Sequence, residues 1–495
     1  MTLMARLVFL FTLLVTAPIA MAASDRVALV LGMSAYQSIP PLDNTINDAE
    51  AMAKALDGIG FDVTLALDAT TDQLRQQLDD FAFRSETADL ALIYFAGHGV
   101  EVQGENFLIP VDANVQSNRD VQRQSVSLKQ LLDAVERARK MRIVILDSCR
   151  DNPLGDLIEL DASGNITRGG GERGGLAAAD PDRGTLVAFA AKDGQVALDG
   201  NGQNSPYASA LIDKMVQPGL EISLMFRQVR DQVLRDTNNL QEPHTYGSLT
   251  GVPFYLAGPG QGQADVAQAQ AVDAWAAIKP DQEEQLLALA DLGDTRSMLG
   301  LAYIRLNPNE GRFDPQAAVG FLERAAEAGS PEAQFELAKL YERGTGVNRD
   351  EKRALELYRA AADQDFADAI NDLGFLHYQG GLGLPADPKR ALSFFERAAD
   401  LRHPQAQFNF AALIDDGLIP SKGPEDAAQY LYAALRSGSQ DVLNLLTDRP
   451  EMFATETRQA LQRELQKYEF YAGAIDGDFG PGTRRSIRLA YGLSE

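Results

Sequence analysis

Short, apolar, strand-like runs recur along the first half of the chain, and helical patterns separate them. The runs cover residues 27–31, 61–65, 90–95, 142–146 and 185–189, and the clearest helical pattern covers residues 48–59. The last three runs are continuous in apolar residues, which is typical of strands whose two faces are both covered by helices. The alternation of all five runs with helices indicates parallel βαβ units. We therefore predict a doubly wound, mostly parallel α/β sheet within residues 24–257.

A different pattern follows a segment rich in Gly, Gln and Ala at residues 258–282, which predicts a flexible linker. Within residues 283–447, amphipathic helices come in pairs with a spacing of about 36 residues. First helices are predicted at 332–341, 368–377 and 405–414, and second helices at 353–362 and 390–399. Small residues at fixed positions let paired helices approach closely, so we expect the pairs to stack as an α-solenoid. A generic helical bundle is the alternative.

The N-terminus has the pattern of a secretory signal. Arg6 precedes an apolar run at residues 7–19, and the small residues of Ala20-Met21-Ala22 follow it. We expect residues 1–22 to be removed and the mature protein to be periplasmic or secreted. An uncleaved anchor is the alternative, but the run is shorter than the ~20 residues of a spanning helix. No later segment is long and apolar enough, so no membrane span is expected after signal cleavage.

Charge and cysteine content narrow the partners and the chemistry. The chain has 45 Lys and Arg against 70 Asp and Glu, a formal net charge of −25, and loss of the signal with Arg6 makes it −26. Such a charge repels nucleic acid and anionic lipid, so nucleic-acid binding is not expected. Cys149 is the single cysteine, so no intramolecular disulfide can form. An unpaired thiol in an exported protein suggests a functional role.

Reactive residues follow two of the predicted strands. His98 comes just after residues 90–95, and Cys149 comes just after residues 142–146. Because ligands bind beyond the carboxyl ends of strands in an open α/β sheet, both side chains are expected at one edge. An imidazole beside a thiol stabilises the thiolate and carries a proton to a leaving amine, and the amides of Gly99 and Cys149 could stabilise an oxyanion. A buried structural cysteine and a structural histidine are the alternatives.

The motifs that contain His98 and Cys149 resemble those of a known family. Tyr-Phe-Ala-Gly-His-Gly at residues 94–99 and Leu-Asp-Ser-Cys-Arg-Asp at residues 146–151 resemble caspase-like cysteine peptidases of the bacterial metacaspase type (peptidase C14). The resemblance covers roughly residues 25–256 and includes the segments 104–112, 204–211 and 248–251. It implies an endopeptidase with His98 and Cys149 as the catalytic dyad, a protein or peptide substrate and no cofactor. No metal site is predicted, because no second cysteine or close histidine accompanies the pair.

The same resemblance implies a substrate pocket lined by Asp48 and Asp147. Two carboxylates at its base would favour a substrate Arg or Lys through charge attraction and paired hydrogen bonds. We therefore predict cleavage after basic residues. The alternative is structural: Asp48 caps the helix at residues 48–59, and Asp147 supports a turn.

A Gly-rich stretch at residues 168–175 follows the predicted nucleophile. Small, polar segments of this kind are favoured sites of proteolytic nicking. Arg168, Arg173 and Arg183 suit the predicted specificity, so self-cleavage in this region is a hypothesis, and an inert flexible loop is the alternative.

Two further resemblances concern the second half of the chain. The helix pairs over roughly residues 290–445 resemble Sel1-like repeats, which implies binding of a protein partner. Residues 451–495 resemble a small peptidoglycan-binding domain on the motif Tyr-Ala-Gly-Ala-Ile-Asp-Gly-Asp-Phe-Gly at residues 471–480, which implies binding of peptidoglycan. A structural cap for the solenoid is the alternative. Asp476 and Asp478 lack the further carboxylates of a calcium loop and suit a turn better than a metal site.

These features predict a periplasmic or secreted cysteine-type endopeptidase that cuts after Arg or Lys and recruits a protein partner through its repeats. Two alternatives stay open. A catalytically silent caspase-fold scaffold would bind without cleaving. A cell-wall amidase would be guided to its substrate by the segment from Ala472 to Thr483, although the pocket that the resemblance implies suits basic peptides better.

Overall fold

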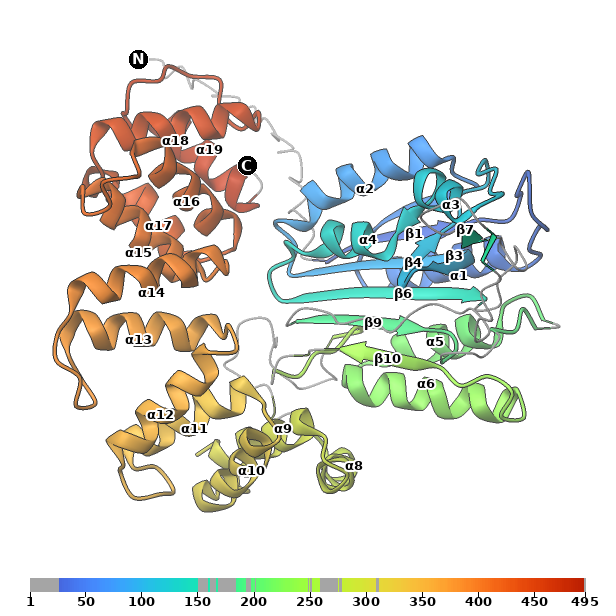
Figure 1. Ribbon diagram of the computed structural model, residues 1–495, viewed down its shortest axis with the longest axis horizontal. Coiled ribbons are helices and arrows are strands. Elements are labelled where there is room, and N and C mark those ends of the chain that lie inside the picture. The colour runs from blue at the N-terminus through green and yellow to red at the C-terminus, as the bar shows by residue number, and fades with distance from the viewer. Residues whose placement is uncertain are drawn as a thin grey trace, which may run out of the picture.

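The computed structural model describes residues 26–149, 159–160, 166–167, 184–192, 197–200, 202–247, 249, 252–258, 275, 278–308 and 311–493 (Figure 1). The predicted signal at residues 1–22 and the hypothetical cleavage sites at Arg168, Arg173 and Arg183 lie outside these ranges. Among the helices in these ranges, none has both the length and the apolar character to cross a membrane. An α/β domain comes first, and an arc of helices that ends in a small helical domain follows it (Figure 1).

An eight-stranded, mostly parallel sheet forms the centre of the α/β domain, as predicted. In spatial order its main strands are β10 (His244–Gly247), β9 (Thr185–Phe189), β6 (Met141–Cys149), β3 (Leu90–Val102), β1 (Arg26–Gly32) and β2 (Asp62–Leu67). The edge strand β10 runs antiparallel to its neighbour β9. Beyond its parallel part β3 pairs with β4 (Glu105–Leu108), which pairs with β5 (Val126–Ser127), and β7 (Glu159–Leu160) pairs separately with β8 (Ile166–Thr167).

Helices cover both faces of the sheet, and each face has its own apolar core. On one face lie α1 (Thr45–Gly58), α5 (Pro206–Met215) and α6 (Ile222–Asp236), and on the other lie α2 (Thr71–Ser85), α3 (Asn118–Gln124) and α4 (Leu128–Val135). Successive residues of a strand enter opposite cores. In β1, Leu29 and Leu31 pack in the core with α2 and α4, whereas Ala28 and Val30 pack in the core with α1 and α5. Apolar residues are therefore needed at successive positions of the central strands, which explains their continuous apolar runs.

Helix pairs form the predicted solenoid in the second half. The helices are α8 (Pro280–Asp291), α9 (Thr295–Leu306), α10 (Pro315–Glu327), α11 (Pro331–Arg343), α12 (Glu351–Ala362), α13 (Ala367–Gln379), α14 (Pro388–Asp400), α15 (Pro404–Asp415), α16 (Pro424–Arg436) and α17 (Gln440–Asp448). The helices α10, α12 and α14 each start after an aspartate, Asp314, Asp350 or Asp387, whose carboxylate accepts the backbone N–H three residues further on. Glycine permits close approach, because a Cβ at Gly374 would lie 2.7 Å from the ring of Phe395.

A small helical domain follows the solenoid, with η1 (Pro450–Met452), α18 (Thr455–Lys467) and α19 (Pro481–Tyr491). Gln462 of α18 holds the turn between the last two helices. Its Nε2 donates to the Asp476 carboxylate and to the Asp478 carbonyl, and its Oε1 accepts the N–H of Gly477. The two aspartates therefore take part in the hydrogen bonds of the turn.

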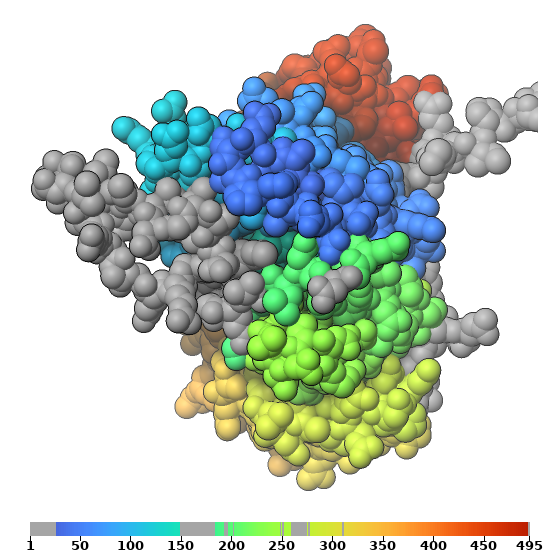
Figure 2. All heavy atoms as spheres, turned by 90° about the vertical axis from the view of Figure 1, so that its right-hand side faces the viewer, coloured from blue at the N-terminus to red at the C-terminus, as the bar shows by residue number. Residues whose placement is uncertain are grey.

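The solenoid lies along the amino-terminal ends of the parallel strands and contacts the α/β domain near both of its own ends (Figure 1). At one end Arg296 pairs with Glu221, the N-cap of α6, at 2.7 Å. At the other end Arg436 pairs with Glu86, just after α2, at 2.9 Å. A cavity of about 1710 Å³ remains between the two domains. Figure 2, which faces the carboxyl-terminal ends of the strands, shows the α/β domain in front, the first repeats below and the C-terminal domain behind its upper edge.

Arg436→Ala tests the contact between the solenoid and the α/β domain. Arg436 and Glu86 are both only 7% exposed, and loss of Arg436 leaves Glu86 with the more exposed Arg137 as its ion-pair partner. We expect the free energy of unfolding to fall by about 1.5–3 kcal/mol in denaturant titrations, the size of a lost hydrogen bond to a charged group. The control Arg349→Ala breaks a solvent-exposed pair with Glu351, and we expect a change below about 1 kcal/mol. Equal losses in the two variants would contradict the importance of the buried pair.

Candidate active site

The two strands that carry the predicted catalytic residues are neighbours in the sheet. β3 and β6 pair in parallel over nine residue pairs, in a register that sets His98 opposite Cys149. Cys149 is the last residue of β6, and β3 turns from its parallel pairing to its pairing with β4 directly after His98. Adjacent strands lie about 4.8 Å apart, so the two backbones are side by side at the carboxyl-terminal edge. The structure thus brings together the two residues that were expected at one edge.

A carbonyl from the loop after β1 orients the ring of His98. The Nε2 atom lies 2.9 Å from the carbonyl oxygen of Pro40, and because a carbonyl only accepts, Nε2 carries a proton and donates it. In the neutral ring Nδ1 is then unprotonated, and it is buried without a hydrogen-bond partner among the described residues. Burial lowers the pKa of His98, against a smaller opposing effect of the bond to Pro40. The neutral ring, with Nδ1 as a base, is therefore favoured near pH 7.

Tyr36 fixes the backbone of the histidine. Its Oη accepts the N–H of His98 at 2.7 Å, and the centroids of the two rings lie 4.7 Å apart. Gly97 makes room for this contact, because a Cβ at that position would lie 2.6 Å from the Tyr36 Oη. Sequence reasoning missed Tyr36 and Pro40, since a loop that reaches a strand about 60 residues away leaves no periodic pattern.

Asp48 and Asp147 come together through a single serine. Ser205, the N-cap of α5, donates its hydroxyl to Asp147 at 2.9 Å and its backbone N–H to Asp48 at 2.9 Å. Tyr94 donates to Asp147 at 2.9 Å, and Asn204 donates to Asp48 at 2.8 Å. The two aspartates are almost enclosed, at 2% and 8% exposure. Thus α1, β6 and the start of α5 meet at one pair of acidic groups, and the roles of Ser205, Asn204 and Tyr94 were not predicted.

Burial disfavours the charged form of both carboxyl groups. It raises the pKa of Asp147 to about 7, and the nearby Asp48 adds to the rise while hydrogen bonds counteract it. Burial also raises the pKa of Asp48 to about 6, against the hydrogen bonds that it accepts, and Asp199 contributes to both rises. A cation placed beside these groups would favour their charged forms. The arrangement therefore suits a positively charged ligand.

Asp48 does not cap a helix, whereas the structural alternative expects it to. The helix predicted to begin at Asp48 begins at Thr45, with Asn44 as its N-cap. Asp48 therefore lies inside the first turn, and its carboxylate bonds to the residues that start α5 instead of capping α1. Asp147 links β6 to the start of α5. The assignment of both aspartates to a substrate pocket stays a prediction.

Gly99, expected to help stabilise an oxyanion, pairs with Leu108 in the ladder of β3 and β4. In the same region the N–H of Ile109 donates to the His98 carbonyl at 3.0 Å, so a second strand holds the backbone around the histidine. The side chain of Cys149 lies outside what the structure describes, and the catalytic and oxyanion roles stay predictions. Within the described ranges, no group of three or more His, Cys, Asp or Glu is placed to hold a metal ion.

Comparison with protein families adds to this geometry. The family described as Caspase domain matches residues 25–254. The chain contains a caspase domain. The family Sel1 repeat matches residues 295–330, 331–366 and 367–403, and the family described as "Putative peptidoglycan binding domain" matches residues 455–489. These matches confirm the three family resemblances and their order along the chain.

Individual proteins match parts of the chain. Human mucosa-associated lymphoid tissue lymphoma translocation protein 1 is 29% identical over 153 residues, which are 30% of this chain and 18% of that protein, and this match also fits the caspase domain. Chitin synthase regulator SKT5 of Saccharomyces cerevisiae is 41% identical over 83 residues, which are 16% of this chain and 12% of that protein. A crystal structure of a Sel1 repeat protein from Oxalobacter formigenes, 22% identical, covers 44% of this chain and 58% of that one with a TM-score of 0.33. The chain thus spans less than a fifth of the curated relatives named here.

Gly97→Ala tests the packing beneath His98 in the caspase domain. The added methyl group would lie 2.6 Å from the Oη of Tyr36 and must displace the acceptor of the His98 N–H. We expect a loss of about 1–3 kcal/mol in the free energy of unfolding, measured by denaturant titration. The control Gly58→Ala in α1 meets no atom within 4 Å and should be neutral or slightly stabilising, because alanine favours helix. Similar stabilities for both variants would refute the packing argument.

Proposed function

We propose that the protein is a cysteine-type endopeptidase that hydrolyses peptide bonds after Arg or Lys, with Cys149 as the nucleophile and His98 as its base. The observation that carries the proposal is the state of the His98 ring. Its Nδ1 is unprotonated in the neutral form and lacks a partner among the described residues, while its backbone pairs with that of the single cysteine. Buried polar atoms are usually satisfied, so an open ring nitrogen at this position suits proton transfer.

In the proposed reaction, Nδ1 of His98 takes the thiol proton of Cys149, and the thiolate attacks the carbonyl carbon of the scissile bond. The negative charge of the tetrahedral intermediate develops on the former carbonyl oxygen, near the amides of Gly99 and Cys149. The imidazolium then gives its proton to the leaving amine, and an acyl-enzyme remains. Water that His98 deprotonates attacks this thioester and releases the carboxylic acid product and the free thiol.

Asp48 and Asp147 support the proposed preference for basic residues. Each carboxylate attracts a unit positive charge 4 Å away by about 4 kcal/mol at an effective dielectric of 20, and repels a substrate Asp by a similar amount. A guanidinium can in addition make two parallel hydrogen bonds to a carboxylate. Their raised pKa values fit a site in which the charged form is favoured when a cation arrives.

The remaining modules support a role at the cell envelope. We place a protein partner on the Sel1 repeats and peptidoglycan on the C-terminal domain, and the family matches of residues 295–403 and 455–489 support this. The signal pattern at residues 1–22 supports a periplasmic or secreted location for the mature protein.

A catalytically silent scaffold is the second candidate. The observation that favours it is the hydrogen bonding of Asp48 and Asp147, which together accept four hydrogen bonds from Tyr94, Asn204 and Ser205. A network of this kind holds α1, β6 and α5 together whether or not a substrate is cleaved.

Peptide cleavage separates the two candidates. The purified mature protein is expected to cleave fluorogenic peptides that end in Arg or Lys and to leave those that end in Asp intact. Cys149→Ala and His98→Ala should each lower kcat/KM by at least about 100-fold, because no thiolate forms without the thiol or its base. Each peptide is assayed with and without calcium and reductant. Absence of cleavage in every condition favours the scaffold, and cleavage only after Asp refutes the pocket assignment.

The pH dependence of KM tests the two aspartates separately from the dyad. Carboxyl groups with raised pKa values lose their charge as the pH falls through about 7 and 6, so the KM for an Arg peptide should rise between pH 8 and pH 5.5. Asp48→Asn should raise this KM roughly tenfold at pH 8 and reduce its pH dependence. The dependence of kcat on the base should appear only at a lower pH, because the pKa of His98 lies below its usual value.

The control for this measurement is a peptide with an uncharged residue before the scissile bond. Its KM should be insensitive both to pH in this range and to Asp48→Asn. A KM for the Arg peptide that stays constant from pH 8 to pH 5.5 would show that the two carboxyl groups do not bind the substrate.

A further inference from the structure

Carboxylates gather on the first helices of two successive repeats. Glu332 and Glu336 lie one turn apart on α11, and Asp368 and Asp372 lie at the same positions of the next repeat, on α13. Residues four apart share a helix face. Glu332 and Asp368 act electrostatically on Glu336, and Asp368 acts on Asp372, so the four groups are close in space. We call these four residues the acidic strip.

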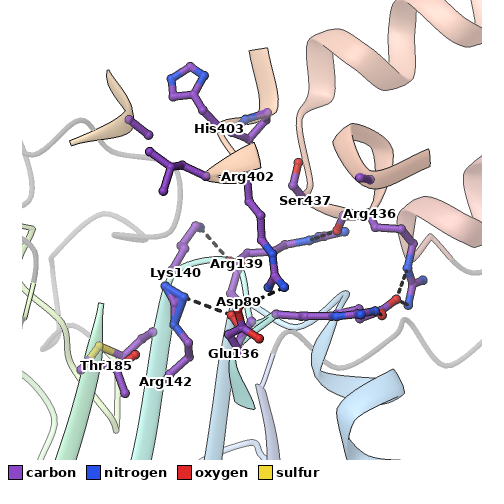
Figure 3. A pocket seen from close by; sticks show the side chains of 18 of the residues that line it. Asp89, Glu136, Arg139, Lys140, Arg142, Thr185, Arg402, His403, Arg436 and Ser437 are labelled. Atoms are coloured by element: carbon purple, nitrogen blue, oxygen red, sulfur yellow. Dashed lines mark hydrogen bonds and ion pairs between the residues drawn. The ribbon is translucent and has the colours of Figure 1, made fainter. Parts of the chain in front are cut away.

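Each end of the acidic strip reaches a cavity. At one end Glu332 and Asp368 line the large cavity between the solenoid and the α/β domain. Figure 3 shows this cavity, with His403 on its solenoid side and Lys140 on its sheet side. At the other end Asp372 lines a second cavity of about 180 Å³. The other residues of this small cavity are Glu342, Tyr358, Phe375, Leu376, Gln379 and Gly380.

The small cavity has the chemistry of a site for one long cationic side chain. Glu342 and Asp372 supply carboxylates, and the Tyr358 hydroxyl donates to Glu342 at 2.7 Å, which positions that carboxylate. The rings of Tyr358 and Phe375 supply apolar and π surface, which suits the stem and the charged end of Lys or Arg. Phe375 is exposed on α13, so the cavity is accessible from solvent.

Lys339 and His403 of the chain itself lie beside two of these carboxylates. Lys339 donates to both oxygens of Glu336 at 3.0 Å, and His403 lies 3.8 Å from Asp368. Burial nevertheless raises the pKa of Glu336 and of Asp372, despite the opposing effect of Lys339 on both. The charged forms of these groups would therefore gain from a further cation.

Two buried amides beside the acidic strip have an acceptor without a partner among the described residues. Asn371, next to Asp372, is 6% exposed, and its Oδ1 is the unpartnered atom. Gln407 on α15 is 4% exposed, lines the large cavity with Asp368, and leaves its Oε1 unpartnered. A buried acceptor without a donor is unfavourable, and ammonium, guanidinium and peptide N–H groups are donors. The amides thus point to the same class of ligand as the carboxylates.

We propose that the acidic strip and the small cavity bind an extended basic segment of a polypeptide, with one Lys or Arg side chain in the small cavity. As a site of substrate recognition this inference rests on the proposed function, because a peptidase that cuts after Arg or Lys acts on basic chains. From Glu332 to Glu342 the helix α11 rises by about 15 Å, which matches about five residues of extended chain.

The distance between the acidic strip and His98 determines how long a substrate must be to bind at both places. The solenoid lies at the amino-terminal ends of the strands, whereas His98 lies at the carboxyl-terminal edge (Figure 1). One chain reaches both places only when it is long. A short peptide uses the catalytic edge alone, and this difference separates the two sites in an experiment.

Binding is measured by calorimetry on the mature full-length protein with Cys149→Ala, using a peptide of about ten residues that alternates Lys and Ala. Glu336→Gln combined with Asp372→Asn is expected to weaken binding at least about tenfold. The matched control, Asp79→Asn with Asp80→Asn, removes the same charge from exposed positions on α2 and should change the affinity less than about twofold. A peptide that alternates Glu and Ala should not bind.

Kinetics test the role in substrate recognition. With a protein substrate that carries a Lys-rich segment far from the scissile bond, Glu336→Gln with Asp372→Asn should raise KM about tenfold and leave kcat unchanged. With a short fluorogenic Arg peptide, the same variant should leave both constants unchanged.

Unchanged binding in Glu336→Gln with Asp372→Asn would overturn the proposal. Equal weakening in the two double variants would also overturn it, because net charge alone would then explain the attraction. Failure of the proposed function has a different signature: neither substrate is cleaved, while binding to the Cys149→Ala protein still depends on Glu336 and Asp372.

Discussion

The pairing of β3 with β6 determines the geometry of the α/β domain and of the candidate site at its edge. Its nine residue pairs set His98 opposite Cys149, and they also align Tyr94 with Ile145 in one core and Phe95 with Leu146 in the other. Because side chains alternate between the faces, a register shift of one residue would exchange the two cores. The apolar residues that stabilise the sheet therefore also hold the histidine and the cysteine at one level. The register that packs the two cores also fixes the positions of the two candidate catalytic residues.

The same register brings the acidic pair into position. Tyr94 lies four residues before His98 on β3, and its hydroxyl reaches Asp147, two residues before Cys149 on β6. Ser205 then ties Asp147 to Asp48 and fixes the start of α5 against both. A displacement of α5 would leave two buried carboxyl groups short of hydrogen bonds, which is unfavourable at this depth. Helix and sheet are thus coupled at the edge where the proposed substrate would bind.

The helices and strands could be predicted well because the positions that are buried in them carry apolar residues at regular spacings along the sequence. Each expected strand is found. The central strands are apolar at successive positions because helices cover both of their faces, whereas the edge strand β2 is mostly exposed or half-buried. The helix pairs recur because each pair buries the same positions. The start of α1 was misplaced, because Asn44 caps it without a side-chain bond and no apolar change marks that boundary. The ends of short helices carry little hydrophobic signal.

Sites that depend on contacts between distant segments were less predictable. The motifs around His98 and Cys149 showed the two candidate residues, and the adjacent strands place their backbones together. Tyr36, Pro40 and Ser205 could not be found in this way, because each acts on a residue more than 50 positions away. Nor could the position of the solenoid, which depends on pairs such as Glu86 with Arg436, 350 residues apart in sequence.

Those ion pairs explain why the solenoid has one defined position on the α/β domain. A buried ion pair adds little net stability compared with apolar contacts, but separating the two partners removes charge-assisted hydrogen bonds from buried groups, which is unfavourable. Glu221 at one end and Glu86 at the other are both buried. If the solenoid slid or tilted on the α/β domain, the ion pair at one end or at both ends would be lost. The separation between the acidic strip and the sheet edge that carries His98 is then a property of the fold. In the proposed mode of binding, a substrate long enough to span this separation would engage both sites without any movement of the repeats.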